Sequence, residues 1–269
     1  MALNEMQQLA VDTTDGPLLI LAGAGSGKTT VLVNRVEHII SSHLATPWQV
    51  LAITFTNKAA GELRERLVSA IGNEANDIWA YTFHSCCSRI LRRFGEKIGY
   101  TNHFTIYDTD DSRRVMKQCQ KQLGIEDKLI NHKSILAEIS RAKDSLISPE
   151  EYKQTAQNDF RKSKIAECYE LYQAQLKKSD AMDFDDIIFN TVKLLEENED
   201  VRNLYQTQFK YVMVDEYILC LHAYNQSTNA LGIAIAASDE LGILLLIIYF
   251  SSELSSESSL FAGFLLRLS

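Results

Sequence analysis

Two hydrophobic periodicities alternate through roughly the first hundred residues. Short apolar runs predict buried strands over residues 18–22, 50–55 and 78–82. Between these runs, apolar residues recur every three or four positions and predict helices over residues 4–11, 28–41, 57–71 and 84–98. Strands that alternate with helices predict an α/β fold with a parallel sheet.

The pattern becomes helical throughout between residues 109 and 198, as Ile135, Ile139 and Leu146 illustrate. We interpret this stretch as a helical insertion within the α/β domain. The apolar run that starts at Tyr211 and ends in Asp215 and Glu216 then predicts a buried parallel strand, with which the sheet resumes.

The composition changes abruptly after Tyr217. Residues 218–269 contain few charged residues, namely Asp239, Glu240, Glu253, Glu257 and Arg267. The apolar stretch 241–250 is too short to cross a bilayer, so it predicts a buried segment or an aggregation-prone strand. The pattern indicates no function for this tail.

Bulk composition narrows the class of protein. With 269 residues and 46% hydrophobic content, the chain can bury a large core in one or two domains. A net charge of −8 gives no general attraction to nucleic acid, so such contacts would need local basic patches. The five cysteines are odd in number and lack C-x-x-C spacing, which disfavours disulfides and zinc ribbons. Without a signal-peptide pattern, we expect a cytoplasmic protein that does not contact membranes. The sequence indicates no oligomeric state.

A glycine-rich segment joins the strand over 18–22 to the helix that follows. Its residues are Ala22, Gly23, Ala24, Gly25, Ser26, Gly27, Lys28, Thr29 and Thr30. This pattern predicts a phosphate-binding loop, in which backbone N–H groups and the helix dipole hold an anion. We expect Lys28 to contact the β- and γ-phosphates of a nucleotide and Thr29 to bind Mg²⁺. Ala22 stands where the motif usually has glycine.

Asp215 and Glu216 are the candidate partners of this loop. A hydrophobic strand that ends in Asp can place a carboxylate near the Mg²⁺ of a phosphate-loop enzyme, so Asp215 is a candidate metal ligand. Glu216 is a candidate general base for the attacking water. The alternative is that both acids are simply solvated at the strand end.

Aromatic and polar residues after two strands suggest a nucleic-acid contact. Phe55 offers a stacking face for a base, and Thr56, Asn57 and His84 can reach phosphate or sugar groups. The alternative for Phe55 is core packing. Basic residues also share one arc of the following helix, which is typical of either a solvated face or a phosphate contact: Arg89, Arg92, Arg93 and Lys97.

Two further clusters predict structure rather than chemistry. Asp183, Asp185 and Asp186 precede an apolar helical stretch, where acids favour the helix start. His84 with the cysteines at 86 and 87 lacks a second pair of ligands, so we expect no metal site there.

The order of these motifs resembles the UvrD/Rep-type superfamily I DNA helicases. Five segments carry the resemblance, namely residues 3–7, 22–29, 53–60, 82–85 and 214–217. The segment 182–186 also looks familial. The resemblance implies a RecA-like phosphate-loop domain 1A over residues 1–107 and 183–217, with an all-helical insertion 1B over 108–182. It also implies that Gln7 reads adenine, that Phe55, Thr56, Asn57 and His84 bind DNA, and that ATP and Mg²⁺ are cofactors.

The implied activity is ATP-driven 3′ to 5′ movement on single-stranded or partial-duplex DNA. The resemblance breaks after Tyr217, where Ile218, Leu219 and Cys220 replace the polar continuation of the motif. We therefore expect residues 218–269 to be an atypical tail from a frame-shifted or truncated gene. We also expect a chain without the second motor domain to bind ATP but not to unwind DNA. Two alternatives stay open: a catalytically inactive module that binds a nucleotide or a partner, and a small-molecule kinase.

Overall fold

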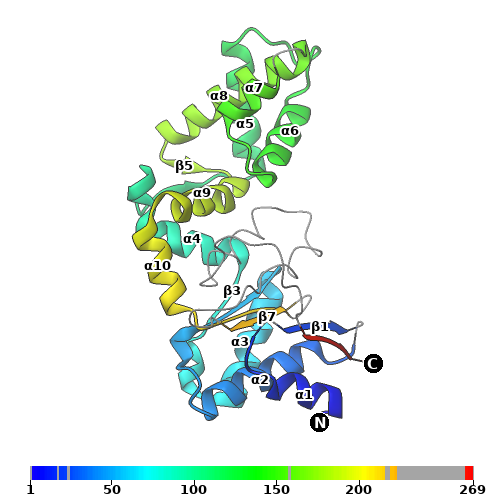
Figure 1. The fold of residues 1–269 in the computed structure, drawn as a ribbon. Helices are drawn as coiled ribbons and strands as arrows, with labels where there is room; N and C mark the ends of the chain where they lie inside the picture. Colours follow the sequence, from blue (N-terminus) through cyan, green and yellow to red (C-terminus); the bar gives the residue numbers. More distant parts are fainter. Residues whose placement is uncertain are drawn as a thin grey trace. The chain divides into compact units, whose positions relative to one another are not determined.

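The computed structural model describes residues 2–16, 18–22, 25–156, 159–215, 219–222 and 264–268. The described residues divide into two units (Figure 1). One unit contains the residues up to Cys86 and those from Asn198 onward, and the other contains Cys87–Glu197. Glu216, Gly23 and Ala24, which the sequence analysis assigned to the nucleotide site, lie outside the described residues.

The first unit alternates helices and strands, as the hydrophobic pattern predicts. Its elements are α1 (Glu5–Asp12), β1 (Leu18–Ala22), α2 (Lys28–Ser41), η1 (Pro47–Gln49), β2 (Val50–Thr54), α3 (Asn57–Ile71), η2 (Asn73–Asp77), β3 (Trp79–Thr82), α10 (Glu199–Gln208), β6 (Tyr211–Val214), β7 (Leu219–His222) and β8 (Phe264–Leu268). Helix α4 (Phe83–Phe94) starts in this unit and continues into the other. The α/β class is thereby confirmed.

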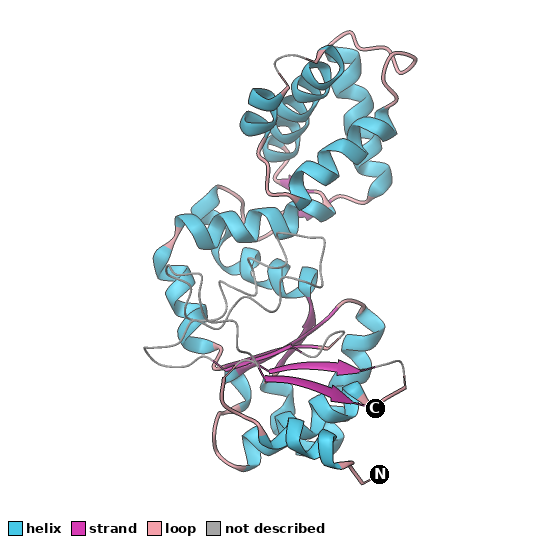
Figure 2. Ribbon diagram, turned by 45° about the vertical axis from the view of Figure 1, so that its right-hand side comes forward, coloured by secondary structure: helices cyan, strands magenta, loops and turns pink. Residues whose placement is uncertain are grey.

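One sheet contains all of these strands, in the order β3-β2-β6-β7-β1-β8 (Figure 2). Strand β2 pairs in parallel with β3 and with β6, and β1 pairs in parallel with β8. Because β1, β2, β3 and β6 run in the same direction, their carboxyl ends meet at one edge of the sheet. That edge is where open α/β sheets bind ligands.

Strand β7 departs from the predicted all-parallel sheet. It pairs antiparallel with β6, where Val214 faces Leu219, and antiparallel with β1, where Leu18 faces Cys220. A parallel connection needs a crossover of a dozen or more residues, whereas only residues 215–218 separate β6 from β7. The short connection therefore forces the chain to reverse direction.

Buried apolar side chains tie the first helices to the sheet. Ala10 of α1, Leu32 of α2 and Leu63 of α3 share one core cluster with Ile20 of β1 and Met213 of β6. Helices α1, α2 and α3 lie along the same side of the sheet in both views (Figures 1 and 2). This packing fixes α2, which follows the predicted phosphate loop, and the helices α1 and α3 beside it.

The second unit is mainly helical. Besides the rest of α4, it contains η3 (Gly95–Ile98), β4 (Thr105–Ile106), α5 (Thr109–Gln122), α6 (His132–Asp144), α7 (Pro149–Thr155), α8 (Phe160–Lys178), β5 (Ala181–Met182) and α9 (Phe184–Glu197). Its core joins residues of these helices, among them Met116, Ile139, Cys168 and Tyr172.

The prediction of helix throughout residues 109–198 is wrong at one place. Residues Ala181–Met182 form β5, which pairs in parallel with β4. A two-residue strand is too short to show a periodicity of its own, so the sequence gives no sign of it. Within the part of the chain that the structure describes, no helix is both long and apolar enough to cross a membrane.

Candidate nucleotide and nucleic-acid site

The predicted phosphate loop joins β1 to α2. Strand β1 ends at Ala22 and α2 begins at Lys28, which is half-buried, as is Thr30. Gly25 and Gly27 have φ of 78° and 85°, a region where a Cβ atom is strained. Gly27 caps α2 without a side-chain hydrogen bond, so the N–H groups of the first turn face no side-chain acceptor from the cap. A helix start of this kind suits an anion.

Gln7 reaches this loop from α1. Its Nε2 donates to the Ser26 carbonyl oxygen at 2.9 Å, and a Cβ atom added at Gly27 would come within 3.1 Å of the same Nε2. Its Oε1 accepts from the Asn4 N–H at 2.9 Å, and Asn4 Oδ1 accepts from the Gln7 N–H at 2.8 Å. Both ends of the Gln7 amide are therefore engaged by the protein. A base that used this amide would have to replace at least one of these bonds.

Thr29 and Asp215 approach each other across 186 positions of sequence. The Thr29 Oγ1 lies 3.4 Å from Asp215 Oδ1 and 3.5 Å from Oδ2. The Asp215 N–H donates to the Ile53 carbonyl at 2.9 Å, so the carboxylate is anchored at the edge of the sheet. These distances are at the long limit of a hydrogen bond.

The donor atoms of this pair suit a hard cation. Mg²⁺ in nucleotide sites takes one or two carboxylates together with phosphate and water oxygens. The hydroxyl of Thr29 and the carboxylate of Asp215 supply such oxygens beside the phosphate loop. Among the described residues there is no group of three His, Cys, Asp or Glu that could hold a metal by itself.

The candidate DNA contacts lie at the same edge of the sheet. Phe55, Thr56 and Asn57 follow β2 directly, and all three are exposed. Phe55 is 39% exposed, and its ring packs edge-on against Phe83 with centroids 5.3 Å apart. Phe55 is therefore only partly covered and is not a fully buried core residue. The hydroxyl of Thr56 accepts from the Ala59 N–H at 3.1 Å and caps α3.

His84 follows β3 and is half-buried. Burial lowers its pKa to about 4, so the ring is neutral at physiological pH. A neutral imidazole can exchange hydrogen bonds with a sugar or phosphate group, but it brings no charge. Any contact of His84 with DNA would be of this uncharged kind.

One residue of the basic arc, Arg92 of α4, makes its contacts within the protein. Arg92 Nη1 donates to the carbonyl oxygens of Asn102 and Phe104 at 3.0 and 2.7 Å, and its guanidinium lies 4.0 Å from the Phe104 ring centroid. This residue fixes the chain that follows α4. Arg89 and Arg93 are exposed.

Comparison with known proteins agrees with this geometry. The profile of the family described as UvrD/REP helicase N-terminal domain matches residues 3–218. The chain belongs to the UvrD/Rep helicase family. It is 47% identical over 216 residues to the ATP-dependent DNA helicase PcrA of Leuconostoc citreum, which covers 80% of this chain and 29% of that protein. The PcrA of Bacillus subtilis (strain 168) is 46% identical over 215 residues, with the same coverage. The chain thus spans less than a third of the length of these relatives.

A buried ion cluster in the helical unit of this UvrD/Rep chain escaped the sequence analysis. Lys143 Nζ lies 2.6 Å from Asp183 Oδ2 and 2.8 Å from Asp186 Oδ1, and Tyr172 donates to Asp183 Oδ2 at 2.9 Å. Burial raises the pKa of Asp186 to about 6. Although burial opposes it, the charge of Lys143 lowers the pKa of Asp183. The sequence offered one signal for this cluster. Lys143 stands four positions after Ile139, on the helix face that carries the apolar residues Ile135 and Ile139.

The predicted capping role at the start of α9 is confirmed for Asp183 and Asp186. The Asp183 N–H donates to Asp186 Oδ2 at 3.1 Å, and the Asp186 N–H donates to Asp183 Oδ1 at 2.9 Å. The two residues therefore form a reciprocal cap while they also hold Lys143 of α6.

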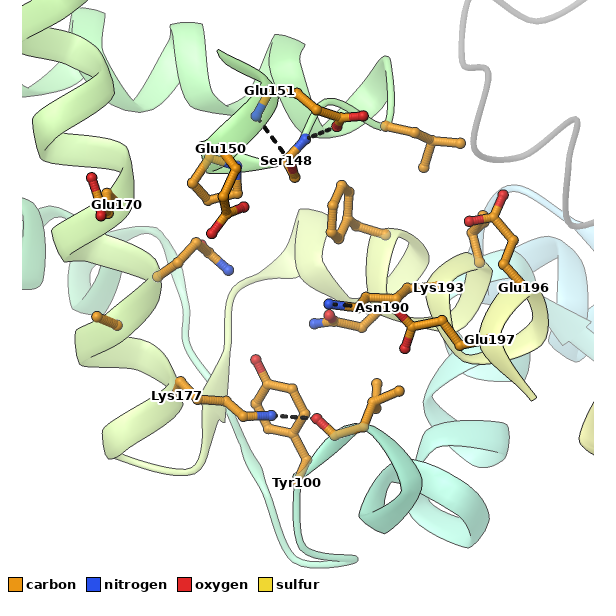
Figure 3. A pocket seen from close by; sticks show the side chains of 17 residues that line it. Tyr100, Ser148, Glu150, Glu151, Glu170, Lys177, Asn190, Lys193, Glu196 and Glu197 are labelled. Carbon is orange, nitrogen blue, oxygen red and sulfur yellow. Dashed lines mark hydrogen bonds and ion pairs between the residues drawn. The ribbon is translucent and has the colours of Figure 1, made fainter. Parts of the chain in front are cut away.

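The helical unit also contains a cavity of about 750 Å³ between α7, α8 and α9 (Figure 3). Some of its lining side chains are engaged within the protein. Lys177 Nζ donates to the Ile98 carbonyl at 2.5 Å and lies 3.4 Å from the centroid of the Tyr100 ring. Glu151 caps α7 through Ser148. The cavity includes none of the residues predicted to bind nucleotide or DNA.

Proposed function

We propose that the first unit of this chain binds Mg·ATP in a RecA-like phosphate-loop site and binds single-stranded DNA at the neighbouring strand ends. The observation that carries the proposal is the approach of Thr29 Oγ1 to the Asp215 carboxylate at 3.4 Å. A helix start after a glycine-rich turn and a carboxylate at the next parallel strand end are the two halves of a nucleotide site.

Each residue of the loop has a defined part in this proposal. Lys28 would supply positive charge to the β- and γ-phosphates, and Thr29 and Asp215 would hold Mg²⁺. The metal, when bound, neutralises charge on the phosphate oxygens. Glu216 accepts a proton from the attacking water, and Gln7 hydrogen-bonds the adenine base.

The order of the strands separates the proposed DNA contacts from the proposed nucleotide site. Neighbouring strands lie about 4.8 Å apart, so four spacings put the end of β3 about 19 Å from that of β1 along the sheet edge. Phe55 stacks on a base, and Thr56, Asn57 and His84 contact the backbone of the strand. The end of β6, with Asp215, lies between the proposed nucleotide site at β1 and the proposed DNA contacts at β2 and β3. A shift of Asp215 on loss of the γ-phosphate could therefore be passed to the DNA contacts.

At the level of domains, we propose that residues 1–107 and 183–217 are domain 1A and residues 108–182 are insertion 1B. The support is the alternation of strands and helices in the first segment and the helices α5, α6, α7 and α8 in the second. Unwinding of duplex DNA in the 3′ to 5′ direction is proposed only for a protein that adds the parts of the PcrA relatives that this chain does not cover.

Binding of a fluorescent ATP analogue tests the nucleotide site. Lys28→Ala should weaken binding at least tenfold, because the side chain supplies charge to the phosphates. Lys58→Ala is the matched control, since this lysine is 87% exposed on α3 and makes only a long ion pair with Glu62. Asp215→Asn should weaken the dependence of binding on Mg²⁺ concentration. Equal affinities of the Lys28 and Lys58 variants would contradict the proposal.

ATP turnover separates this function from its alternative, a catalytically inactive nucleotide- or partner-binding module. An enzyme should hydrolyse ATP faster when single-stranded DNA is added, and Lys28→Ala should remove that stimulation. A binding module should show no turnover above that of the Lys28→Ala variant.

A further inference from the structure

Arg35 is the largest fully buried side chain of the described residues. It lies on α2, two turns after the phosphate loop, and is 0% exposed. Arginine is almost never fully buried unless its charge is satisfied by a partner. The position therefore requires an explanation from the groups around the guanidinium.

The groups that accept its hydrogen bonds belong to the end of α1. Arg35 Nη1 donates to the carbonyl oxygen of Ala10 at 2.6 Å and to that of Thr13 by a second, short hydrogen bond. The last carbonyl groups of a helix lack partners within it and carry partial negative charge. Helix α1 has no basic residue in its own last turn. Arg35 supplies this missing cation from α2.

Stability alone does not account for the residue. The Nε and Nη2 atoms of Arg35 are buried without a hydrogen-bond partner among the described residues. Burying a charged group with unused donors is costly, and an apolar side chain of similar volume is often at least as stable in such a place. The placement is better explained by what the tether does to α1.

The same helix carries Gln7, one turn before Ala10. A helical turn of α1 rises about 5 Å, so a shift at the Arg35 end is passed directly to the Gln7 amide. Helix α1 is thus tied to α2 by Arg35 and to the loop before α2 by the bond from Gln7 to Ser26. We infer that Arg35 is a positioning residue for nucleotide recognition, which holds α1 in place while the Gln7 amide exchanges one of its bonds, to Asn4 or to Ser26, for a bond to the base. This inference rests on the proposed function.

The ratio of the Kd for GTP to that for ATP tests the inference. Arg35→Met keeps the volume and removes the hydrogen bonds, and it should reduce the preference for ATP about threefold to tenfold, the worth of one hydrogen bond. Gln7→Ala should cause a similar loss, and the double variant should lose no more than Gln7→Ala alone. Arg35→Lys, which can still donate to a carbonyl, should restore part of the preference.

A general loss of stability would give a different result. Ile39→Val removes one methyl group from a buried side chain of the same helix and should leave the ratio unchanged. If Arg35→Met weakened ATP and GTP equally, or if the losses from Arg35→Met and Gln7→Ala multiplied, the inference would be wrong.

Hydrogen exchange without nucleotide distinguishes the failure of the inference from that of the proposed function. Arg35→Met should speed amide exchange in α1 and leave α3 unchanged. Unchanged exchange in α1 would refute the inference whether or not the chain binds nucleotide. Faster exchange in α1, in a chain whose unsubstituted form binds no ATP, would refute the proposed function and with it the role of the tether in recognition.

Discussion

Replacement of Phe55 by alanine tests the DNA surface most directly. The ring follows β2 at the carboxyl edge of the sheet and packs edge-on against Phe83 at an interplanar angle of 66°. An edge-on neighbour supports the ring without covering both of its faces. The 39% exposure of Phe55 means that part of the ring is free to meet a base.

The expected magnitude follows from this geometry. Stacking of one base on an aromatic side chain is worth about 1 to 3 kcal/mol. Because Phe83 already occupies part of the Phe55 surface, we expect the lower part of this range, about 1 to 2 kcal/mol. Loss of that stacking energy should raise the Kd for single-stranded DNA roughly fivefold to thirtyfold. Loss of the contact with Phe83 costs about 0.5 to 1.5 kcal/mol as well, but that cost falls on folding rather than on binding.

Fluorescence anisotropy of a labelled oligothymidylate, titrated at constant salt, measures the change. Trp48→Ala is a matched control, because Trp48 is an exposed aromatic residue that precedes β2 and so lies at the opposite edge of the sheet. The Kd should rise for the Phe55 variant and stay the same for the Trp48 variant. Equal effects of the two substitutions, or none from Phe55→Ala, would refute the stacking argument.

Two further predictions concern the ion cluster of the helical unit. Lys143→Met leaves two buried carboxylates without their cation and should lower the free energy of unfolding in urea by about 3 to 5 kcal/mol. Lys153→Met, which removes an exposed ion pair with Glu170, should change the free energy of unfolding little. Equal losses of stability from the two substitutions would contradict the special cost of the buried cluster. Because the pKa of Asp186 is raised to about 6, this residue should make the protein less stable as pH rises from about 3.8 to 6. Asp186→Asn should flatten the pH dependence of unfolding in that window, and an unaltered profile would show that Asp186 is not its source.

Local signals in the sequence predict much of the first unit. The glycines of the phosphate loop mark the junction of a strand with a helix, and the structure has β1 and α2 on either side of it. The acids before α9 predict its cap for the same reason, since capping depends on neighbours in sequence. The roles assigned to the loop residues stay predictions, although Thr29 and Asp215 do come together.

Contacts between residues far apart in the sequence could not be predicted from local patterns. The ion pair between Lys143 and Asp183 joins residues 40 positions apart, and no local pattern names the partner. The bond from Gln7 Nε2 to the Ser26 carbonyl needs the loop to be folded against α1. The short connection after β6 explains why β7 runs antiparallel, but the pairing of β7 with β1 depends on which gap in the sheet the segment fills, and hydropathy does not report that.

The neighbours of β1 have a consequence for how the proposed nucleotide site responds to sequence change. Both strands that flank it, β7 and β8, come from the stretch after residue 218, beyond the region that matches the family profile. Their contacts with β1 are ladder pairs between main-chain atoms, which do not depend on side-chain identity as long as the segment can extend and donate. Most side-chain substitutions in β7 and β8 should therefore leave their pairing with β1 intact. A proline inserted in either strand, by contrast, would act at a distance on the backbone that leads into Lys28.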